Sequence, residues 1–163
     1  MRRPTQLDEI DALIVPGGES TTIGKLAAQY GLIEPIQKRA AAGMPVWGTC
    51  AGAIFIATDV PSHPHPLAGL IDMTVERNAF GRQADSFEAD LDVPALGAEP
   101  FHGVFIRAPR IARVGKDVEV LATLDDRATV VAARHGRILA TSFHPELTAD
   151  HRFHRYFLEL GPG

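Results

Sequence analysis

The chain has 163 residues, of which 45% are hydrophobic, and a formal net charge of −4 at pH 7. This length fits one domain, residues 1–163, that buries about two thirds of its unfolded surface. The mild negative charge excludes a strongly basic nucleic-acid-binding domain, and no apolar run suits a membrane span or a signal peptide. One cysteine rules out an internal disulfide, so we expect a protein of a reducing compartment, the cytoplasm.

The first predicted strand, at residues 11–15, is apolar without polar alternation, as in a parallel sheet that is covered on both faces. It ends in the turn Pro16-Gly17-Gly18-Glu19-Ser20-Thr21-Thr22. Two glycines followed by hydroxyl side chains predict free backbone N–H groups and then a helix N-cap. This turn either merely connects strand to helix or binds an anion or a carbonyl group. It lacks the spacing of a phosphate-binding P-loop.

Two helices are predicted next, at residues 23–30 and 33–42, each stopped by a glycine. A short buried strand at 45–47 then meets a buried helix at 51–57, and Cys50 lies at their junction in Gly48-Thr49-Cys50-Ala51-Gly52. Small residues on both sides allow the sharp turn that exposes a nucleophile, and a helix N-terminus favours the reactive thiolate. The alternative is a small apolar side chain packed beneath the helix.

A surface loop rich in proline and histidine is predicted at residues 59–69. His63 and His65 lie there without acidic or sulfur-containing neighbours. Metal ligands are usually grouped with such neighbours, so we interpret both histidines as solvated and expect no metal site.

The second half of the chain changes to short β-prone runs separated by turns, at residues 71–76, 86–91, 103–106, 118–124, 129–133 and 138–143. A polar segment, 77–83, lies between the first two runs. Arg107 ends the third run. It is either a solvated charge or a clamp for a carboxylate, and the spacing leaves both possibilities open.

The last predicted strand leads into Ser142-Phe143-His144-Pro145-Glu146-Leu147, before a helix at 149–160. In extended chain the side chains of His144 and Glu146 share a face, so the carboxylate can hold the imidazole while its other nitrogen faces a thiol. The alternative is a capping histidine and a surface glutamate. His151 and His154, on the final helix, are interpreted as solvated.

The Cys50 motif together with His144-Pro145-Glu146 resembles the class I, or triad, glutamine amidotransferases. Further strings are similar to one branch, the glutaminase subunit of pyridoxal 5′-phosphate synthase. They are Pro16 to Thr22, Glu76-Arg77-Asn78-Ala79-Phe80-Gly81-Arg82-Gln83, Asp85-Ser86-Phe87-Glu88-Ala89-Asp90 and Phe143-His144-Pro145-Glu146-Leu147-Thr148. The resemblance runs from about Arg3 to about Leu160.

The resemblance implies an α/β three-layer sandwich with a mostly parallel central sheet, flavodoxin-like in topology. It implies a glutaminase in which Cys50 attacks the glutamine amide, His144 is the base and Glu146 fixes the imidazole. The backbone N–H groups of Gly18 and Ala51 would form the oxyanion hole. The implied contacts to L-glutamine come from Gly18, Glu19, Ser20, Arg77, Ile106 and Arg107.

The resemblance also implies a partner, a (β/α)8-barrel synthase subunit that receives the ammonia through a tunnel and builds pyridoxal phosphate from ribose 5-phosphate and glyceraldehyde 3-phosphate. The glutaminase itself would carry no cofactor, and neither nucleic acid nor a membrane is an expected partner.

The chain departs from the family at its start, because family members open with a strand, a Leu-Gln-Gly turn, a helix and a second strand before the segment that begins here at Arg3. The sequence leaves open a start set too far downstream or a truncated copy. On this basis we expect the short chain to be poorly soluble and weakly active. The alternative function is a non-catalytic relative that only binds the synthase. A cysteine peptidase or a chaperone on a similar fold is a third option, against which the His-Pro-Glu context argues.

Overall fold

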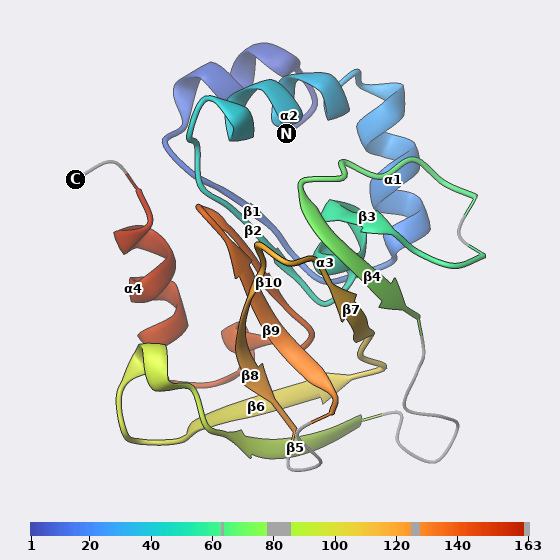
Figure 1. The fold of residues 1–163 in the computed structure, drawn as a ribbon. Helices are drawn as coiled ribbons and strands as arrows, with labels where there is room; N and C mark the ends of the chain where they lie inside the picture. Colours follow the sequence, from blue (N-terminus) through green and yellow to red (C-terminus); the bar gives the residue numbers. More distant parts are fainter. Residues whose placement is uncertain (63, 78–85, 125–127, 162–163) are drawn as a thin grey trace.

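The computed structural model describes residues 1–62, 64–77, 86–124 and 128–161, and shows helices on both sides of a central sheet (Figure 1). The helices are α1 (Ser20–Gln29), α2 (Ile33–Ala41), α3 (Ala51–Ile56) and α4 (Arg152–Glu159), with 3-10 turns at Pro4–Glu9, Pro94–Leu96 and Pro145–Leu147. The strands are β1 (Leu13–Val15), β2 (Val46–Thr49), β3 (Ala57–Asp59), β4 (Ile71–Glu76), β5 (Ser86–Leu91), β6 (Phe101–Ile106), β7 (Arg110–Val114), β8 (Glu119–Thr123), β9 (Val130–His135) and β10 (Ile138–Thr141).

The central sheet is mixed. Within the described residues it has eight strands in the order β1-β2-β10-β9-β7-β4-β3, with β8 paired to β9, while β5 and β6 form a separate ribbon. Strands β1, β2 and β10 are parallel, as are β3 and β4, whereas β9 and β7 run antiparallel to their neighbours. The expectation of a mostly parallel sheet therefore holds only for β1, β2 and β10 and for the separate pair β3 and β4, because the strands between them are antiparallel.

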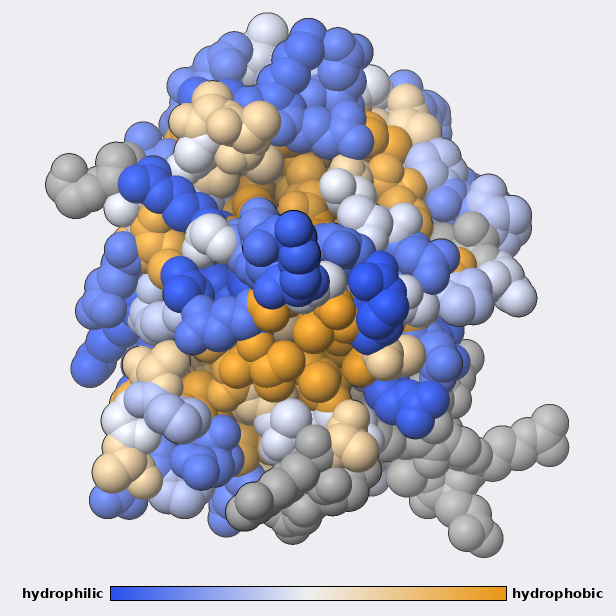
Figure 2. Space-filling model, viewed as in Figure 1, coloured by the Kyte–Doolittle hydropathy of each residue, from blue (hydrophilic) through white to orange (hydrophobic). Residues whose placement is uncertain are grey.

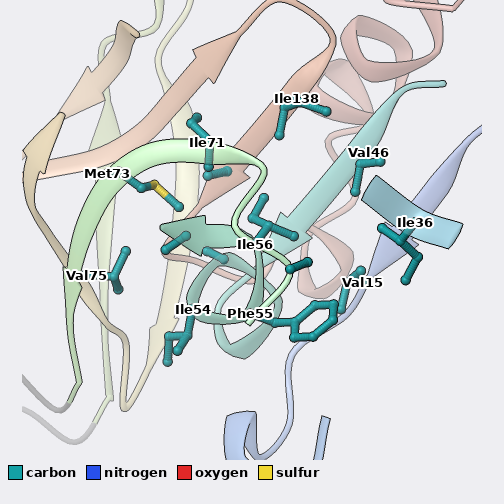
Figure 3. Packing of buried hydrophobic residues seen from close by; sticks show 14 of the residues in the cluster. Val15, Ile36, Val46, Ile54, Phe55, Ile56, Ile71, Met73, Val75 and Ile138 are labelled. Atoms are coloured by element: carbon teal, nitrogen blue, oxygen red, sulfur yellow. The ribbon is translucent and has the colours of Figure 1, made fainter. Parts of the chain in front are cut away.

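Residues of β2 and β10 alternate between two hydrophobic clusters, which lie on opposite faces of the sheet. Val46 and Ala140 belong to the first cluster, together with side chains of α1, α2, α3 and β4. Figure 3 shows side chains of this cluster from α2, α3, β2 and β4 turned toward one another. Every residue of α3 is buried, as its run of small and apolar residues predicts.

The second cluster forms on the opposite face, where Trp47 and Leu139 meet α4 and the β5–β6 ribbon. Trp47 lies 5.4 Å from the ring of Phe157 and donates a hydrogen bond of 3.1 Å from Nε1 to Thr141 Oγ1. The three layers are therefore α1–α3, the sheet, and α4 with the ribbon. The predicted three-layer α/β class is confirmed.

The first strand differs from its prediction. It covers only residues 13–15 and lies at the edge of the sheet, where among the described residues its strand partner is β2. Ile14 keeps 44% of its surface exposed, so the strand is not covered on both faces as its apolar sequence suggested. Apolar residues recur on the visible surface: Figure 2 shows hydrophobic patches among the polar side chains, and Val120 on β8 is 42% exposed.

Most other elements match the sequence, and β4 and β5 have the predicted bounds. Strands β3 and β7 were missed, and α4 begins at Arg152, after a 3-10 turn at Pro145–Leu147. His63 and the segment 78–85 lie outside the described residues. No helix of the described chain is long and apolar enough to cross a membrane.

Candidate active site

The three parallel strands β1, β2 and β10 end at the same edge of the sheet. Beyond these ends lie the Pro16-Gly17-Gly18 turn, Cys50 and His144, which come from distant parts of the sequence. A cleft of about 470 Å³ opens there, and its lining contains every predicted glutamine-binding residue together with the thiol and the imidazole. The lining residues are Gly18, Glu19, Ser20, Cys50, Ala51, Ile54, Arg77, Ile106, Arg107 and His144.

Cys50 has the strained backbone of a nucleophile elbow. Its φ is 49° and its ψ −108°, a conformation that costs a residue with a side chain about 1–3 kcal/mol. Its N–H donates to the carbonyl of Thr141 over 2.8 Å, so β10 holds the turn in place. The flanking glycines are required by close contact: a Cβ on Gly48 would lie 2.5 Å from the carbonyl oxygen of Gly52, and one on Gly52 would overlap that of Val15.

The thiol of Cys50 is sheltered, since the residue keeps only 7% of its surface exposed. Its Sγ lies 3.9 Å from the carbonyl oxygen of Ile106 on β6. Cys50 nevertheless belongs to the lining of the cleft. The two interpretations from the sequence, an exposed nucleophile and a packed side chain, thus both describe part of its environment.

His144 and Glu146 are hydrogen-bonded, with 2.8 Å between Nδ1 and Oε1. The pair forms through the 3-10 turn Pro145–Leu147 and not through the extended chain that the sequence suggested. The His144 N–H donates to the carbonyl of Val104 over 2.8 Å, which ties His144 to β6. A hydrogen bond to Cys50 raises the pKa of His144 to about 9. Burial acts in the opposite direction, and the bond to Glu146 adds to the rise.

The turn after β1 is shaped by Gly18, whose φ of 139° is a conformation that only glycine adopts readily. The next residue, Glu19, caps α1 by accepting hydrogen bonds from the N–H groups of Thr21 (3.1 Å) and Thr22 (2.8 Å). These bonds lower the pKa of Glu19 to about 2. A glutamate therefore provides the cap that the sequence assigned to a hydroxyl side chain, and Ser20, buried, begins the helix.

The two arginines singled out in the sequence both reach the cleft. Arg77 lies 3.3 Å from the carboxylate of Glu19. Arg107 has a φ of 43°, so the end of β6 is strained where it enters the cleft. Whether these guanidinium groups bind a carboxylate stays a prediction.

Among the described residues, the cleft lining contains no histidine other than His144. His151 is exposed as predicted, but His154 is half-buried against Trp47, with ring centroids 5.1 Å apart, so the solvated interpretation is wrong for it. His102 on β6 is hydrogen-bonded to both Glu88 and Asp90 on β5. This contact was not predicted from the sequence, although side chains alternate along β5 and β6 so that all three lie on one face of the ribbon. In the part of the chain that the structure describes, no group of three or more His, Cys, Asp or Glu residues could hold a metal ion.

Gly17, the first glycine of the turn, had no separate role predicted from the sequence. Its backbone lies against the imidazole of His144. Two consecutive glycines follow β1 in the sequence, and of the two only Gly18 has a positive φ that requires glycine. The presence of glycine at position 17 as well was therefore the sign of a separate role for Gly17.

Comparisons with known proteins agree with this geometry. A family model described as "SNO glutamine amidotransferase family" matches residues 1–161. The chain is 60% identical over 163 residues to "Pyridoxal 5'-phosphate synthase subunit PdxT" of Herpetosiphon aurantiacus, covering 98% of this chain and 85% of that protein. It is 58% identical over 159 residues to the protein of the same name from Pelotomaculum thermopropionicum, covering 98% and 80%.

A solved structure titled "Crystal structure of glutamine amidotransferase" superposes with a TM-score of 0.92 at 54% identity, covering 98% of this chain and 84% of that one. The fold implied by the resemblance is therefore confirmed. Because the family model spans nearly the whole sequence and the relatives exceed half identity over most of their own length, the chain belongs to the SNO glutamine amidotransferase family.

Proposed function

We propose that this chain is the glutaminase subunit of a pyridoxal 5′-phosphate synthase, with Cys50, His144 and Glu146 as its catalytic triad. Family membership and the names of the relatives support the activity and the partner. One observation carries the site: Cys50 and His144 line a single cleft, Cys50 acts on His144 strongly enough to raise the pKa of the imidazole, and Glu146 accepts a hydrogen bond from its Nδ1. This is the spatial order of nucleophile, base and orienting carboxylate.

The raised pKa of His144, about 9, favours an imidazolium beside the thiol at neutral pH. The thiolate form of Cys50 attacks the side-chain amide carbon of glutamine, and a C–S bond forms as the carbonyl oxygen becomes an oxyanion. When this tetrahedral adduct collapses, the C–N bond breaks and the imidazolium gives its proton to the departing nitrogen. Ammonia and a γ-glutamyl thioester result.

Hydrolysis of the thioester uses the same groups in reverse. Neutral His144 takes a proton from water, the hydroxide adds to the thioester carbonyl, and a second oxyanion forms. Its collapse breaks the C–S bond, returns the electron pair to sulfur and releases glutamate, whose new carboxyl group ionises in water. Glu146 keeps Nδ1 protonated throughout, so the other nitrogen is the one that exchanges the proton.

The oxyanion of both adducts is assigned to the backbone N–H groups of Gly18 and Ala51. Each such donor is worth about 3–4 kcal/mol of transition-state stabilisation. The cleft lining contains both residues together with Cys50. Binding of the glutamine backbone groups is assigned to Glu19, Ser20, Arg77, Ile106 and Arg107, with the arginines suited to its α-carboxylate.

The proposed partner is a (β/α)8-barrel synthase subunit that takes the ammonia through a tunnel. The test supplies the purified chain with L-glutamine labelled with ¹⁵N in its amide, together with the synthase subunit of a close relative, ribose 5-phosphate and glyceraldehyde 3-phosphate. We expect ammonia release that the synthase stimulates, and ¹⁵N in the pyridine ring of the product. Binding to the synthase without either result would instead support the non-catalytic alternative.

A further inference from the structure

The turn between β1 and α1 places the backbone of Gly17 directly against the imidazole of His144. A Cβ on Gly17 would lie 2.5 Å from Cε1, 3.2 Å from Nδ1 and 3.4 Å from Nε2, and these are its three nearest atoms. A side chain at this position would therefore meet the ring of the proposed base before anything else.

We propose that Gly17 is a positioning residue for His144: its bare backbone forms one wall of the slot that holds the imidazole between Cys50 and Glu146. This inference deepens the proposed function, since it rests on His144 being the base. Gly18, which contributes the oxyanion N–H, and Gly17 would then have separate tasks in one turn.

The requirement for glycine at position 17 comes from space, because its φ lies outside the left-handed range, unlike the φ of 139° at Gly18. The backbone itself therefore accepts an L-residue here. What it does not accept is a Cβ, since the imidazole occupies that volume.

The imidazole has little freedom to give way while remaining in register. Its residue is bonded to Val104 through the backbone N–H, and its Nδ1 is bonded to Glu146. The side chain keeps only 14% of its surface exposed, so most of the space around the ring is filled. A side chain at position 17 would push the ring away from Gly17, and the ring would lose its place between the thiol and the carboxylate.

The size of the displacement follows from the contact. Carbon atoms pack at about 3.5–4.0 Å, so a Cβ at 2.5 Å from Cε1 demands a relative shift of about 1 Å. A misplacement of about 1 Å in a catalytic group costs about 10²-fold in rate. Binding of glutamine, which the other cleft residues provide, should change little.

The first test is Gly17→Ala in the full chain with its synthase partner. We expect kcat for glutamine hydrolysis to fall about 100-fold while KM changes less than about 3-fold. Gly161→Ala is the matched control, because its Cβ would also be tight, 3.0 Å from the carbonyl of Leu158, but lies at the end of α4 away from the cleft lining. Parent-like kcat in Gly17→Ala, or a loss seen only in KM, overturns the proposal.

The second test reads the thiol without glutamine or synthase, so its result does not depend on the proposed activity. The rate of Cys50 alkylation by iodoacetamide is measured against pH in the parent and in Gly17→Ala. An imidazolium at hydrogen-bond distance stabilises a thiolate. Displacement of His144 should therefore slow the alkylation of Cys50 at neutral pH. An unchanged rate of alkylation contradicts a positioning role.

A double-mutant cycle separates this role from a general effect on stability. In a His144→Ala background the volume beside residue 17 is vacated, so adding Gly17→Ala should change neither the alkylation profile nor the melting temperature. If Gly17→Ala alone fails to fold, recovery of folding in the double variant supports the contact, and failure there too overturns it. If Gly17→Ala lowered the alkylation rate and the melting temperature equally in the parent and in His144→Ala, Gly17 would act independently of His144 and the proposal would be overturned.

Discussion

Replacing Glu146 by glutamine tests the orienting carboxylate with the least change of shape. Glutamine keeps an oxygen that can accept the hydrogen bond from His144 Nδ1, which is 2.8 Å in the parent, but removes the charge. A hydrogen bond to a charged group contributes about 1.5–3 kcal/mol, against about 0.5–1.5 kcal/mol for a neutral pair. The exchange should therefore cost on the order of 1–1.5 kcal/mol, or about 5- to 13-fold in rate.

Two features of the site adjust this magnitude in opposite directions. The Glu146 side chain is 46% exposed, so solvent screens much of the attraction between its charge and the imidazolium, and this lowers the expected loss of rate. A glutamine can also rotate and present its NH₂ to Nδ1, which would select the wrong imidazole tautomer for part of the time. Because these two effects oppose each other, we expect a fall in kcat of about 5- to 13-fold for Glu146→Gln, with KM nearly unchanged.

The assay is ammonia release in the presence of the synthase subunit, measured across pH. Because Glu146 contributes to the raised pKa of His144, the variant should also titrate its base at lower pH than the parent. Glu159→Gln, an exposed change on α4, is the control and should leave both quantities unaltered. A Glu146→Gln variant within two-fold of the parent in turnover would refute the orienting role.

Three further outcomes follow from the same geometry. Cys50→Ala should abolish glutamine hydrolysis and labelling by a glutamine-like chloroketone without lowering the melting temperature. His144→Ala should reduce turnover nearly as much, since members of a triad act as a unit. Residual hydrolysis above background in Cys50→Ala would exclude the thiol as nucleophile. Gly52→Ala should lower the Tm by about 5–10 °C in a thermal melt, because its Cβ overlaps the Val15 carbonyl and overpacking costs about 1–3 kcal/mol; a parent-like Tm would contradict that overlap. The pKa of His144 rises from 6.5 to about 9 on folding, so the contribution of its protonation to the stability of the fold is complete below about pH 6.5 and is lost as the pH rises through 9. The difference in Tm between the parent and His144→Ala should therefore shrink between pH 6.5 and 9. A constant difference in Tm would be inconsistent with the raised pKa.

The parts of the fold that the sequence predicts well are those with clean local patterns. Strand β4 alternates buried and less buried residues over its whole length, and its bounds were predicted correctly. Strand β7 was missed because Arg110 and Arg113 interrupt its pattern. In the structure these arginines form ion pairs with Glu76 and Asp72 on the neighbouring strand β4. The sequence of β7 alone does not reveal these partners.

The same distinction applies to the site. The strand-to-helix junction at Cys50 and the His-Pro-Glu string are local, so both were found, although the turn that joins His144 to Glu146 was not. The contact between Gly17 and His144 depends on the strand order β1-β2-β10, which brings together residues 127 positions apart. Local spacing carries no signal for it.

The order in which the cleft residues occur in the chain has a consequence during protein synthesis. Cys50 precedes His144 by 94 residues, so at about 5–20 residues per second the ribosome adds the base roughly 5–20 s after the thiol. The N–H of Cys50 also depends on Thr141 of β10, which follows it by 91 residues, for its bond at the elbow. A nascent chain that has not yet reached β10 and His144 therefore holds Cys50 without the bond that secures its strained turn and without the proposed base. The proposed glutaminase site cannot act on glutamine before both have been added.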